Sequence, residues 1–443
     1  MKKIAFHNLG CKVNTYELDA MMQMLIDEGY QQVPFEETAD IYIINTCTVT
    51  NIADRKSRQM IHKARKNNPD AVIVAVGCYV QTRAGGEGLE DIDLCIGNNH
   101  KGEIAKILKE YLGQKMTIVS DLSKPCGYDN MSVNKTSEHT RAFIKVQDGC
   151  NQFCSYCIIP TARGRVRSRA IEDVVNEITT LSSKGFKEFV ITGIHLSSYG
   201  TDWDYDDIKA DRFGEGHLID LLTKVDAIEG VERIRLGSLE PRIITESFLD
   251  AIGRLDSICP HFHLSLQSGC DETLKRMNRH YSAAEFKEKT ELIRRYFEHP
   301  AITTDVIVGF PGETEEEFKT TKEFLQDIHF FEMHIFKYSR RKGTPADTMP
   351  GQLTDAVKTA RSHILEEVER SDSKAFRQDV IGSSQEVLFE EVKNIAGKDY
   401  WVGHTREYIK LAYGNKDSKE NLEGLIKTVK VGDFLTDEYL LAE

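Results

Sequence analysis

Short apolar runs alternate with amphipathic stretches along the first part of the chain. Three runs rich in β-branched residues, at 4–6, 41–44 and 72–76, have the length and composition of buried strands. The stretch 16–28 between the first two carries apolar residues at helical spacing. This alternation predicts a small α/β domain with a parallel sheet over residues 1–120.

A second series of strand-like runs begins after residue 136. Helical segments such as 171–184, 217–228 and 314–327 separate these runs. Repeated strand–helix units predict a parallel barrel over 136–365, and six strands in place of about eight predict an incomplete one. Ligands of such a barrel gather at the carboxyl ends of its strands. The six predicted strands are 142–146, 189–192, 233–237, 263–266, 303–308 and 333–338.

The pattern changes again after a charged helix predicted over 354–376. Short apolar runs at 387–389, 400–402, 408–411 and 426–431 are divided by glycine and polar turns. This pattern is typical of a small all-β barrel, which we place at 378–443. We interpret the acidic and aromatic stretch 200–216 as a loop insertion and assign it no role.

Composition limits the kind of protein and its compartment. A chain of 443 residues is longer than one hydrophobic core usually serves, which agrees with three domains. A net charge of −13 argues against bulk attraction to nucleic acid, so any RNA contact must come from local patches. No export signal or membrane-spanning run is visible. We therefore expect a cytoplasmic protein without a membrane partner. Its ten cysteines indicate metal or redox chemistry and argue against a disulfide framework.

Cys150, Cys154 and Cys157 lie within eight residues, directly after the first predicted barrel strand. Three thiolates on one loop can each bind one iron of a [4Fe–4S] cluster, and no fourth cysteine lies nearby. The remaining iron could then chelate the amino and carboxylate groups of S-adenosylmethionine (SAM). The alternatives are a zinc site or three unrelated cysteines, but a second pair of zinc ligands at suitable spacing is missing.

Cys11, Cys47 and Cys78 are far apart, yet each follows an apolar strand of the first domain. The carboxyl ends of parallel strands meet at one crevice, so three thiols at these positions could hold a second cluster. The alternative is that each is a small buried residue, as cysteine often is. Cys95, Cys126, Cys259 and Cys270 match neither arrangement, and we interpret them as structural.

The 150–157 loop resembles the CxxxCxxC signature of radical SAM enzymes. Its flanks, Ala142 to Gly149 before it and Ile158-Ile159-Pro160 with Arg163-Gly164 behind it, resemble the methylthiotransferases, and the similarity runs nearly end to end. Gly10-Cys11, Asn45-Thr46-Cys47 and Gly77-Cys78 resemble the motifs of that family's N-terminal cluster. The resemblance implies two [4Fe–4S] clusters, of which the N-terminal one carries the inserted sulfur, and two uses of SAM, as methyl donor and as radical source.

The family also implies a set of SAM-binding positions at the strand ends of the barrel. Ordinary turn chemistry is the alternative meaning of most of these residues. The expected positions are Tyr156, Thr192, Gly193, Ser238, Glu240, Gln267 and Val308.

Arginines near the cluster loop are the candidate RNA contacts. Arg163, Arg165, Arg167 and Arg169 alternate along the chain, and in an extended segment they would present charge along one face. A solvated charged stretch is the alternative. We expect Arg163, Arg165 and Arg167 to contact RNA, assisted by Arg276 and Arg279. The tail resembles a TRAM domain, an RNA-binding barrel in which Tyr400, Trp401 or Tyr408 would stack on bases or belong to the core.

Three branches of the family differ next to the first cysteine. Leu9 to Asn14 and Asn45 to Thr50 most resemble the branch that acts on N6-threonylcarbamoyladenosine beside the tRNA anticodon. The isopentenyladenosine branch usually has Gln-Met where this chain has Lys12-Val13, and a third branch modifies an aspartate of a ribosomal protein. The expected partners are the tRNA anticodon stem-loop, a reducing protein such as flavodoxin or ferredoxin, and a sulfur donor. We expect the chain to act as a monomer.

Overall fold

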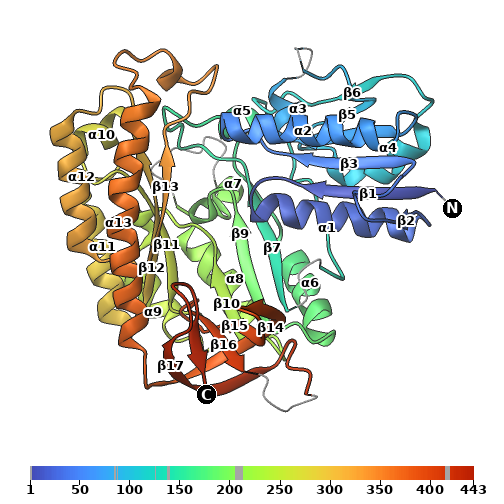
Figure 1. The fold of residues 1–443 in the computed structure, drawn as a ribbon. Helices are drawn as coiled ribbons and strands as arrows, with labels where there is room; N and C mark the ends of the chain where they lie inside the picture. The colour runs from blue at the N-terminus through green and yellow to red at the C-terminus, as the bar shows by residue number, and fades with distance from the viewer. Residues whose placement is uncertain are drawn as a thin grey trace.

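The computed structural model describes residues 2–443 except 84, 85, 87, 125, 137–139, 205–212 and 415–419. An N-terminal sheet lies beside the central strands, and the C-terminal strands lie at one end of them (Figure 1). None of the described helices is long and apolar enough to cross a membrane.

The N-terminal sheet has six parallel strands in the order β2-β1-β3-β4-β5-β6. The predicted parallel α/β arrangement is confirmed, and the three predicted strands are β1, β3 and β4. The other three strands have only two or three residues each, too few for a visible pattern. The strands are β1 Lys3–Asn8, β2 Gln31–Gln32, β3 Ile41–Thr46, β4 Val72–Gly77, β5 Leu94–Ile96 and β6 Met116–Ile118.

Helices cover both faces of this sheet. One apolar cluster contains Ile61 of α2, and the opposite one contains Met21 of α1 and Ile107 of α4. Helix α1 begins directly after Cys11, four residues earlier than predicted. The helices are α1 Lys12–Asp27, α2 Asn51–Asn67, α3 Cys78–Thr82, η1 Lys101–Glu103 and α4 Ile104–Glu110.

The central part is an open barrel of six parallel strands in chain order. β7, β9 and β10 pair with one another, as do β11, β12 and β13, and a bridge between Leu239 and Leu264 joins the two groups. The short β8 lies antiparallel at the edge. All six predicted strands are confirmed. The strands are β7 Arg141–Asp148, β8 Arg167–Ser168, β9 Glu188–Gly193, β10 Arg233–Leu236, β11 His261–Gln267, β12 Ala301–Val308 and β13 Glu332–Lys337.

Helices surround these strands and share the largest apolar cluster with them. The 25-residue α13 packs along β13 and leads to the tail, as the charged pattern predicted. The helices are α5 Ile159–Ala162, α6 Ile171–Ser183, η2 Leu196–Ser198, α7 Thr201–Asp204, α8 Glu215–Asp226, η3 Pro241–Ile243, α9 Glu246–Ile252, α10 Asp271–Arg276, α11 Ala283–Tyr296, α12 Glu315–Ile328, η4 Pro345–Asp347 and α13 Asp355–Asp379. Much of the stretch 200–216 lies outside the described residues.

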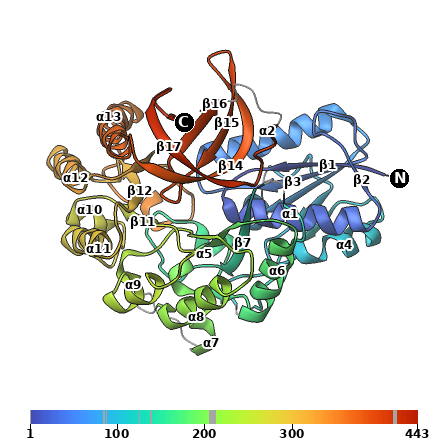
Figure 2. The ribbon, with the colours of Figure 1, turned by 90° about the horizontal axis from the view of Figure 1, so that it is seen from below.

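The tail is a closed barrel in the order β14-β15-β16-β18-β17, which confirms the predicted all-β fold. It covers the amino ends of the central strands (Figure 2). Accordingly, Ala301 at the start of β12 belongs to the apolar cluster of the tail. Arg233 and Arg235 of β10 donate to the tail carbonyls of His404 and Arg406, both at 2.9 Å. The strands are β14 Ser384–Ile395, β15 Lys398–His404, β16 Lys410–Gly414, β17 Ile426–Phe434 and β18 Leu440–Ala442.

Candidate active site

Cys11, Cys47 and Cys78 lie at the carboxyl ends of β1, β3 and β4, which are neighbours in the sheet. A Cβ on Gly10 would lie 3.1 Å from the Cβ and 3.3 Å from the Sγ of Cys47, so the Cys11 turn runs directly against Cys47. Gly10 also has φ +118°, which L side chains rarely adopt. The topology therefore brings Cys11, Cys47 and Cys78, which are spread over more than sixty residues of sequence, to one edge of the sheet. We call these three thiols the sheet triad.

The surroundings of Cys47 and Cys11 favour neutral thiols until a metal binds. Burial raises the pKa of Cys47 to about 11, and the nearby Cys78 and Cys11 add to the rise. Burial also raises the pKa of Cys11, against the effect of Arg163. Metal binding displaces such protons, and three convergent thiolates are a ligand set that a [4Fe–4S] cluster accepts. The sheet triad fits this cofactor.

Cys150, Cys154 and Cys157, the loop triad, lie on the connection between β7 and α5. Backbone bonds fix this loop: Cys150 N–H donates to the Gly164 carbonyl at 3.0 Å, and Ser155 N–H to the Met277 carbonyl at 2.9 Å. A Cβ on Gly149 would lie 1.8 Å from the Arg165 carbonyl oxygen, so only glycine fits before Cys150. The loop thereby holds its three thiols in one position.

Burial also favours protonated thiols at Cys150 and Cys157 in the absence of metal. It raises the pKa of Cys157 to about 12 and that of Cys150 further, and Cys154 adds to both shifts. Arg279 donates from its guanidinium to Cys154 Sγ at 3.2 Å and to Glu240 at 2.9 Å. A cation directed at a ligand sulfur suits an anionic cluster. The loop triad therefore also fits a [4Fe–4S] cluster.

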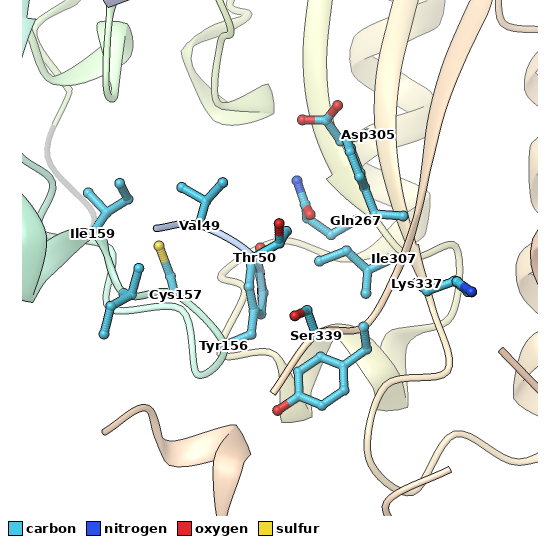
Figure 3. Close-up of a pocket in the computed structure, with 13 residues that line it drawn as sticks. Val49, Thr50, Tyr156, Cys157, Ile159, Gln267, Asp305, Ile307, Lys337 and Ser339 are labelled. Atoms are coloured by element: carbon cyan, nitrogen blue, oxygen red, sulfur yellow. The ribbon is translucent and has the colours of Figure 1, made fainter. Parts of the chain in front are cut away.

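A cavity of about 280 Å³ lies between the two triads. Val49 and Thr50, which follow Cys47, line it on one side with Tyr156 and Cys157 (Figure 3). Strand residues of the barrel line the other side. These are Gln267, Asp305, Ile307, Phe336, Lys337, Tyr338 and Ser339, and Ile158 and Ile159 complete the lining. A molecule in this cavity would contact the loops of both triads.

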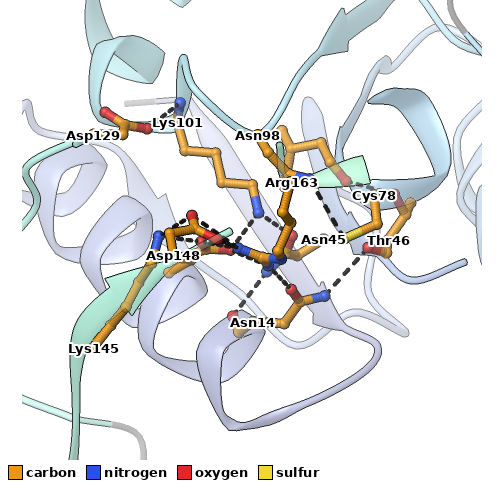
Figure 4. A network of polar contacts seen from close by, with 12 residues as sticks. Asn14, Asn45, Thr46, Cys78, Asn98, Lys101, Asp129, Lys145, Asp148 and Arg163 are labelled. Atoms are coloured by element: carbon orange, nitrogen blue, oxygen red, sulfur yellow. Dashed lines mark hydrogen bonds and ion pairs between the residues drawn. The ribbon is translucent and has the colours of Figure 1, made fainter. Parts of the chain in front are cut away.

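A buried polar network links the elements that carry the two triads, and Lys101, Lys145, Asp148 and Arg163 belong to it (Figure 4). Its centre is Glu17 of α1. The Glu17 carboxylate accepts from Lys101 at 2.5 Å, Lys145 at 2.7 Å and Arg163 at 2.8 Å. Asp148, two residues before Cys150, accepts from Lys145 at 2.7 Å and Arg163 at 3.1 Å. Burial by itself would raise the pKa of Glu17, but Arg163, Lys101 and Lys145 hold it well below its usual range. With Arg167, which lies 3.4 Å from Asp148, four cations face these two carboxylates, and this excess positive charge suits anionic clusters nearby.

Asparagines extend the network to the backbone around the cysteines. Asn14 accepts from Arg163 at 2.6 Å and donates to the Thr46 carbonyl, next to Cys47, at 3.2 Å. Asn98 donates to Cys78 Sγ at 3.4 Å and to the Ala162 carbonyl of α5 at 2.6 Å. One side chain therefore contacts a sulfur of the sheet triad and the helix that follows the loop triad.

Comparison with known proteins places this architecture. Residues 144–325 match the model of the radical SAM superfamily, and residues 3–97 match that of the uncharacterised protein family UPF0004. The threonylcarbamoyladenosine tRNA methylthiotransferase MtaB of Bacillus subtilis is 40% identical over 97% of this chain and 94% of its own length. The chain belongs to the radical SAM tRNA methylthiotransferases. Members of this family use SAM and [4Fe–4S] clusters, and so does this methylthiotransferase.

Two further proteins define the range of similarity. A tRNA-2-methylthio-N(6)-dimethylallyladenosine synthase of Clostridium botulinum is 33% identical over 97% of this chain and 95% of its own length. The radical S-adenosylmethionine methyltransferase TsrM of Kitasatospora setae has a similar fold, with a TM-score of 0.55 at 15% identity, covering 78% of this chain and 74% of that one. This likeness supports the radical SAM fold assigned to the methylthiotransferase.

The positions expected to bind SAM in this methylthiotransferase occupy different environments. Tyr156 and Gln267 line the cavity. Thr192 and Gly193 end β9, and Ser238 is exposed after β10. Glu240 is buried and paired with Arg242 and Arg279. Val308 is 1% exposed in the barrel core and does not line the cavity.

The prediction that Arg163 binds RNA is wrong, because its guanidinium is fully buried and paired with Glu17 and Asp148. The same holds for Arg167, buried against Asp148 and Cys126. The Arg279 side chain is buried as well, and its guanidinium donates to Cys154 Sγ and pairs with Glu240.

Two of the expected RNA-binding arginines keep some exposure. Arg276 is partly exposed, but Glu317 already binds it through both carboxylate oxygens, at 2.9 and 2.6 Å. Arg165 lies over the exposed ring of Phe153, 4.6 Å from its centroid, and makes no ion pair among the described residues. Arg165 is therefore the member of the set whose surroundings suit a phosphate.

The aromatic residues of the tail serve the fold in this methylthiotransferase. Trp401 is 8% exposed in the tail core, and Tyr400 packs against a second small apolar cluster. Tyr408 stacks on His261 of β11 at 5.2 Å and accepts from Arg141 at 2.7 Å. Tyr408 thus belongs to the contact between tail and barrel.

Sequence reasoning missed Glu17, Lys101, Lys145 and Asn98, because charged and amide residues at single positions carry no signal. It also missed His195, which follows β9. Its Nδ1 lies 2.7 Å from Ser198 Oγ, at hydrogen-bond distance, and its ring lies near Glu240 and Arg279. Cys95, Cys259 and Cys270 are buried apart from the triads, and Cys126 Sγ accepts from Arg167.

Proposed function

We propose that the chain attaches a methylthio group to C2 of N6-threonylcarbamoyladenosine in tRNA, beside the anticodon. The observation that carries this substrate is the 40% identity to MtaB of Bacillus subtilis over nearly the whole length of both chains. Identity to the dimethylallyladenosine synthase of Clostridium botulinum is lower, at 33%. Lys12 and Val13 after the first cysteine agree with this choice over the isopentenyl and ribosomal-protein branches.

The six triad cysteines are the proposed cluster ligands. Cys150, Cys154 and Cys157 would hold the cluster that binds SAM, and the sheet triad the cluster that carries sulfur. When bound, SAM and the clusters supply the radical and the sulfur. The chain contributes fixed thiol positions, N–H donors from Arg279 and Asn98 to ligand sulfurs, and a cavity between the loops in which the base is held away from water.

Three units follow from this assignment. Residues 1–120 carry the sulfur cluster, 136–365 form the radical SAM core, and 378–443 form a TRAM-like unit. Because the tail covers the amino ends of the barrel strands, the target nucleotide enters from the opposite end, unstacked from the anticodon loop. Arg165 beside the loop triad is the proposed phosphate contact.

The same proposal includes partners and location. Flavodoxin or ferredoxin would reduce the loop-triad cluster, and a sulfur donor would recharge the sheet-triad cluster. The substrate is the tRNA anticodon stem-loop, and the enzyme works as a cytoplasmic monomer.

Mass spectrometry of tRNA nucleosides tests the substrate. Cells without the gene should lose the 2-methylthio derivative of threonylcarbamoyladenosine, and the intact gene should restore it. A gene carrying Cys154→Ala should not restore it. Loss of the 2-methylthio derivative of isopentenyladenosine instead would show that the substrate assignment is wrong.

A further inference from the structure

Three polar side chains gather on the inner face of the last three barrel strands. His263 of β11, Asp305 of β12 and His334 of β13 have ligand atoms within 4.8 Å of one another. His263 Nε2 lies 3.4 Å from Asp305 Oδ2, and the rings of His263 and His334 stack with centroids 5.9 Å apart. Asp305 and His334 are direct partners in the register of β12 and β13. Neither triad nor network uses these residues.

This cluster adjoins the cavity between the triads. Asp305 lines the cavity itself, as Ile307 does two residues later (Figure 3). On β13, Phe336 lines it, and His334, two residues earlier, shares the face of Phe336 because side chains alternate along a strand. The cavity therefore has apolar walls of Ile307, Phe336 and Tyr338 and a polar end at Asp305.

The polar end has unused hydrogen-bonding capacity. His263 is oriented by Thr303, whose Oγ lies 3.0 Å from Nδ1, and by Asp305. His334 is exposed, and the structure gives its ring nitrogens no hydrogen bond or ion pair among the described residues. The ring nitrogens of His334 are therefore available to bind a polar ligand group beside the cavity.

The cluster offers both kinds of hydrogen-bonding group to a polar ligand. The carboxylate of Asp305 can accept from N–H or O–H groups, and the His334 ring can donate an N–H to an oxygen.

The geometry points to His263, Asp305 and His334 as the subsite that binds the N6 substituent of the target adenosine and selects the threonylcarbamoyl group, an inference that rests on the proposed function. That substituent offers a ureido N–H and a hydroxyl to Asp305, and a carboxylate to His334, while His263 keeps its contacts with Thr303 and Asp305. A dimethylallyl group is a hydrocarbon and would give Asp305 and His334 no hydrogen bond. Sites built to hydrogen-bond a ligand discriminate strongly against analogues that lack the polar groups.

Binding of anticodon stem-loop RNAs to the cluster-loaded enzyme tests the subsite. The probes carry threonylcarbamoyladenosine, dimethylallyladenosine or unmodified adenosine at the target position, and anisotropy gives the Kd. His334→Ala should weaken binding of the threonylcarbamoyl RNA about 10- to 100-fold, the range for a hydrogen bond to a charged group. Binding of the unmodified RNA should change less than about threefold, because its base makes none of these contacts.

Matched variants separate recognition from folding. His363→Ala replaces an exposed histidine of α13 outside the site and should leave all three Kd values unchanged. His334→Gln keeps a donor and an acceptor and should retain most of the preference. Equal weakening of all three RNAs by His334→Ala, or no weakening, would overturn the subsite.

Two further results have distinct meanings. A wild-type enzyme that methylthiolates only the dimethylallyl RNA would refute the proposed function, whereas an active wild-type enzyme with an unchanged His334→Ala preference refutes only the subsite. Titration with Co²⁺ in the absence of RNA should give no visible d–d band that depends on His334. A stoichiometric band abolished by His334→Ala would instead make these residues a metal site.

Discussion

The two triads reach the same chemical composition by opposite routes. The loop triad is contained in one eight-residue turn, held by local backbone bonds and a glycine that tolerates no side chain. The sheet triad is gathered from three strand ends, and its geometry depends on the order β1-β3-β4 and on the packing of α1. A local motif is thus robust to changes elsewhere, whereas a dispersed one depends on the whole domain.

Two single variants, each of which removes one thiol from one triad, should have the largest effects and should distinguish the two triads. Cys154→Ala should abolish reductive SAM cleavage, and Cys47→Ala should abolish methylthiolation while SAM is still cleaved, since each loss empties one cluster. Iron should fall from about eight to about four per chain in both variants. Cys270→Ser, at a buried cysteine outside the triads, should keep the full iron content. Full iron in Cys47→Ala would mean that the sheet triad holds no cluster.

Glu17→Gln should disrupt the shared network next most strongly. Lys101, Lys145 and Arg163 would lose a common anion in a fully buried site, and breaking such a pair costs about 3–5 kcal/mol. Urea unfolding monitored by circular dichroism measures this loss. Glu36→Gln, which removes an exposed ion pair with Lys63, is the control and should change little. A stable Glu17→Gln protein would show that the network does not hold the two units together.

Acid should affect the neighbourhood of the loop triad through His195. Burial lowers the pKa of folded His195 to about 4. The charge of Glu240 opposes this shift, and the charges of Arg279 and Arg242 add to it. The unfolded chain binds this proton near pH 6.5. Stability is therefore complete above pH 6.5 and falls as the pH decreases toward 4, by about 3 kcal/mol in total.

Thermal unfolding midpoints between pH 7 and pH 4.5 measure this dependence. His195→Gln keeps a partner for Ser198 but cannot titrate, so its midpoint should fall less steeply than that of the wild type. Parallel curves for the two proteins would exclude His195 as the titrating group.

The smallest expected effect concerns the N–H donor of the sheet triad. Asn98→Leu removes the hydrogen bond to Cys78 Sγ. That hydrogen bond stabilises the more negative, reduced state of the cluster. The potential of that cluster should fall by about 40 mV, equivalent to about 1 kcal/mol for one electron. Redox titration followed by electron paramagnetic resonance measures it. Asn394→Leu on the exposed tail hairpin should leave the potential unchanged.

The same contrast explains what the sequence could predict. The loop triad and the six barrel strands could be predicted from the sequence, because cysteine spacing and apolar runs are local properties. The sheet triad was predictable only because three cysteines followed three recognised strands. Glu17 meets Lys101 and Lys145 at separations of 84 and 128 residues, and no local pattern encodes such contacts.

Arg163 shows the limit most clearly. Its alternation with Arg165 suggested an exposed charged face, but the turn after α5 directs it into the interior. Alternating charges predict that the arginines share one face of a segment, but they do not show whether that face points to solvent or to the protein interior. Burial of Arg163 depends on Glu17 and Asp148, whose role became visible only in three dimensions.

The contact between Arg233, Arg235 and the tail carbonyls has a consequence for the gene. A chain ending after α13 would remove the carbonyl acceptors of two buried guanidinium groups and leave Glu188 as their shared partner, so loss of the last sixty or so codons should destabilise the barrel as well.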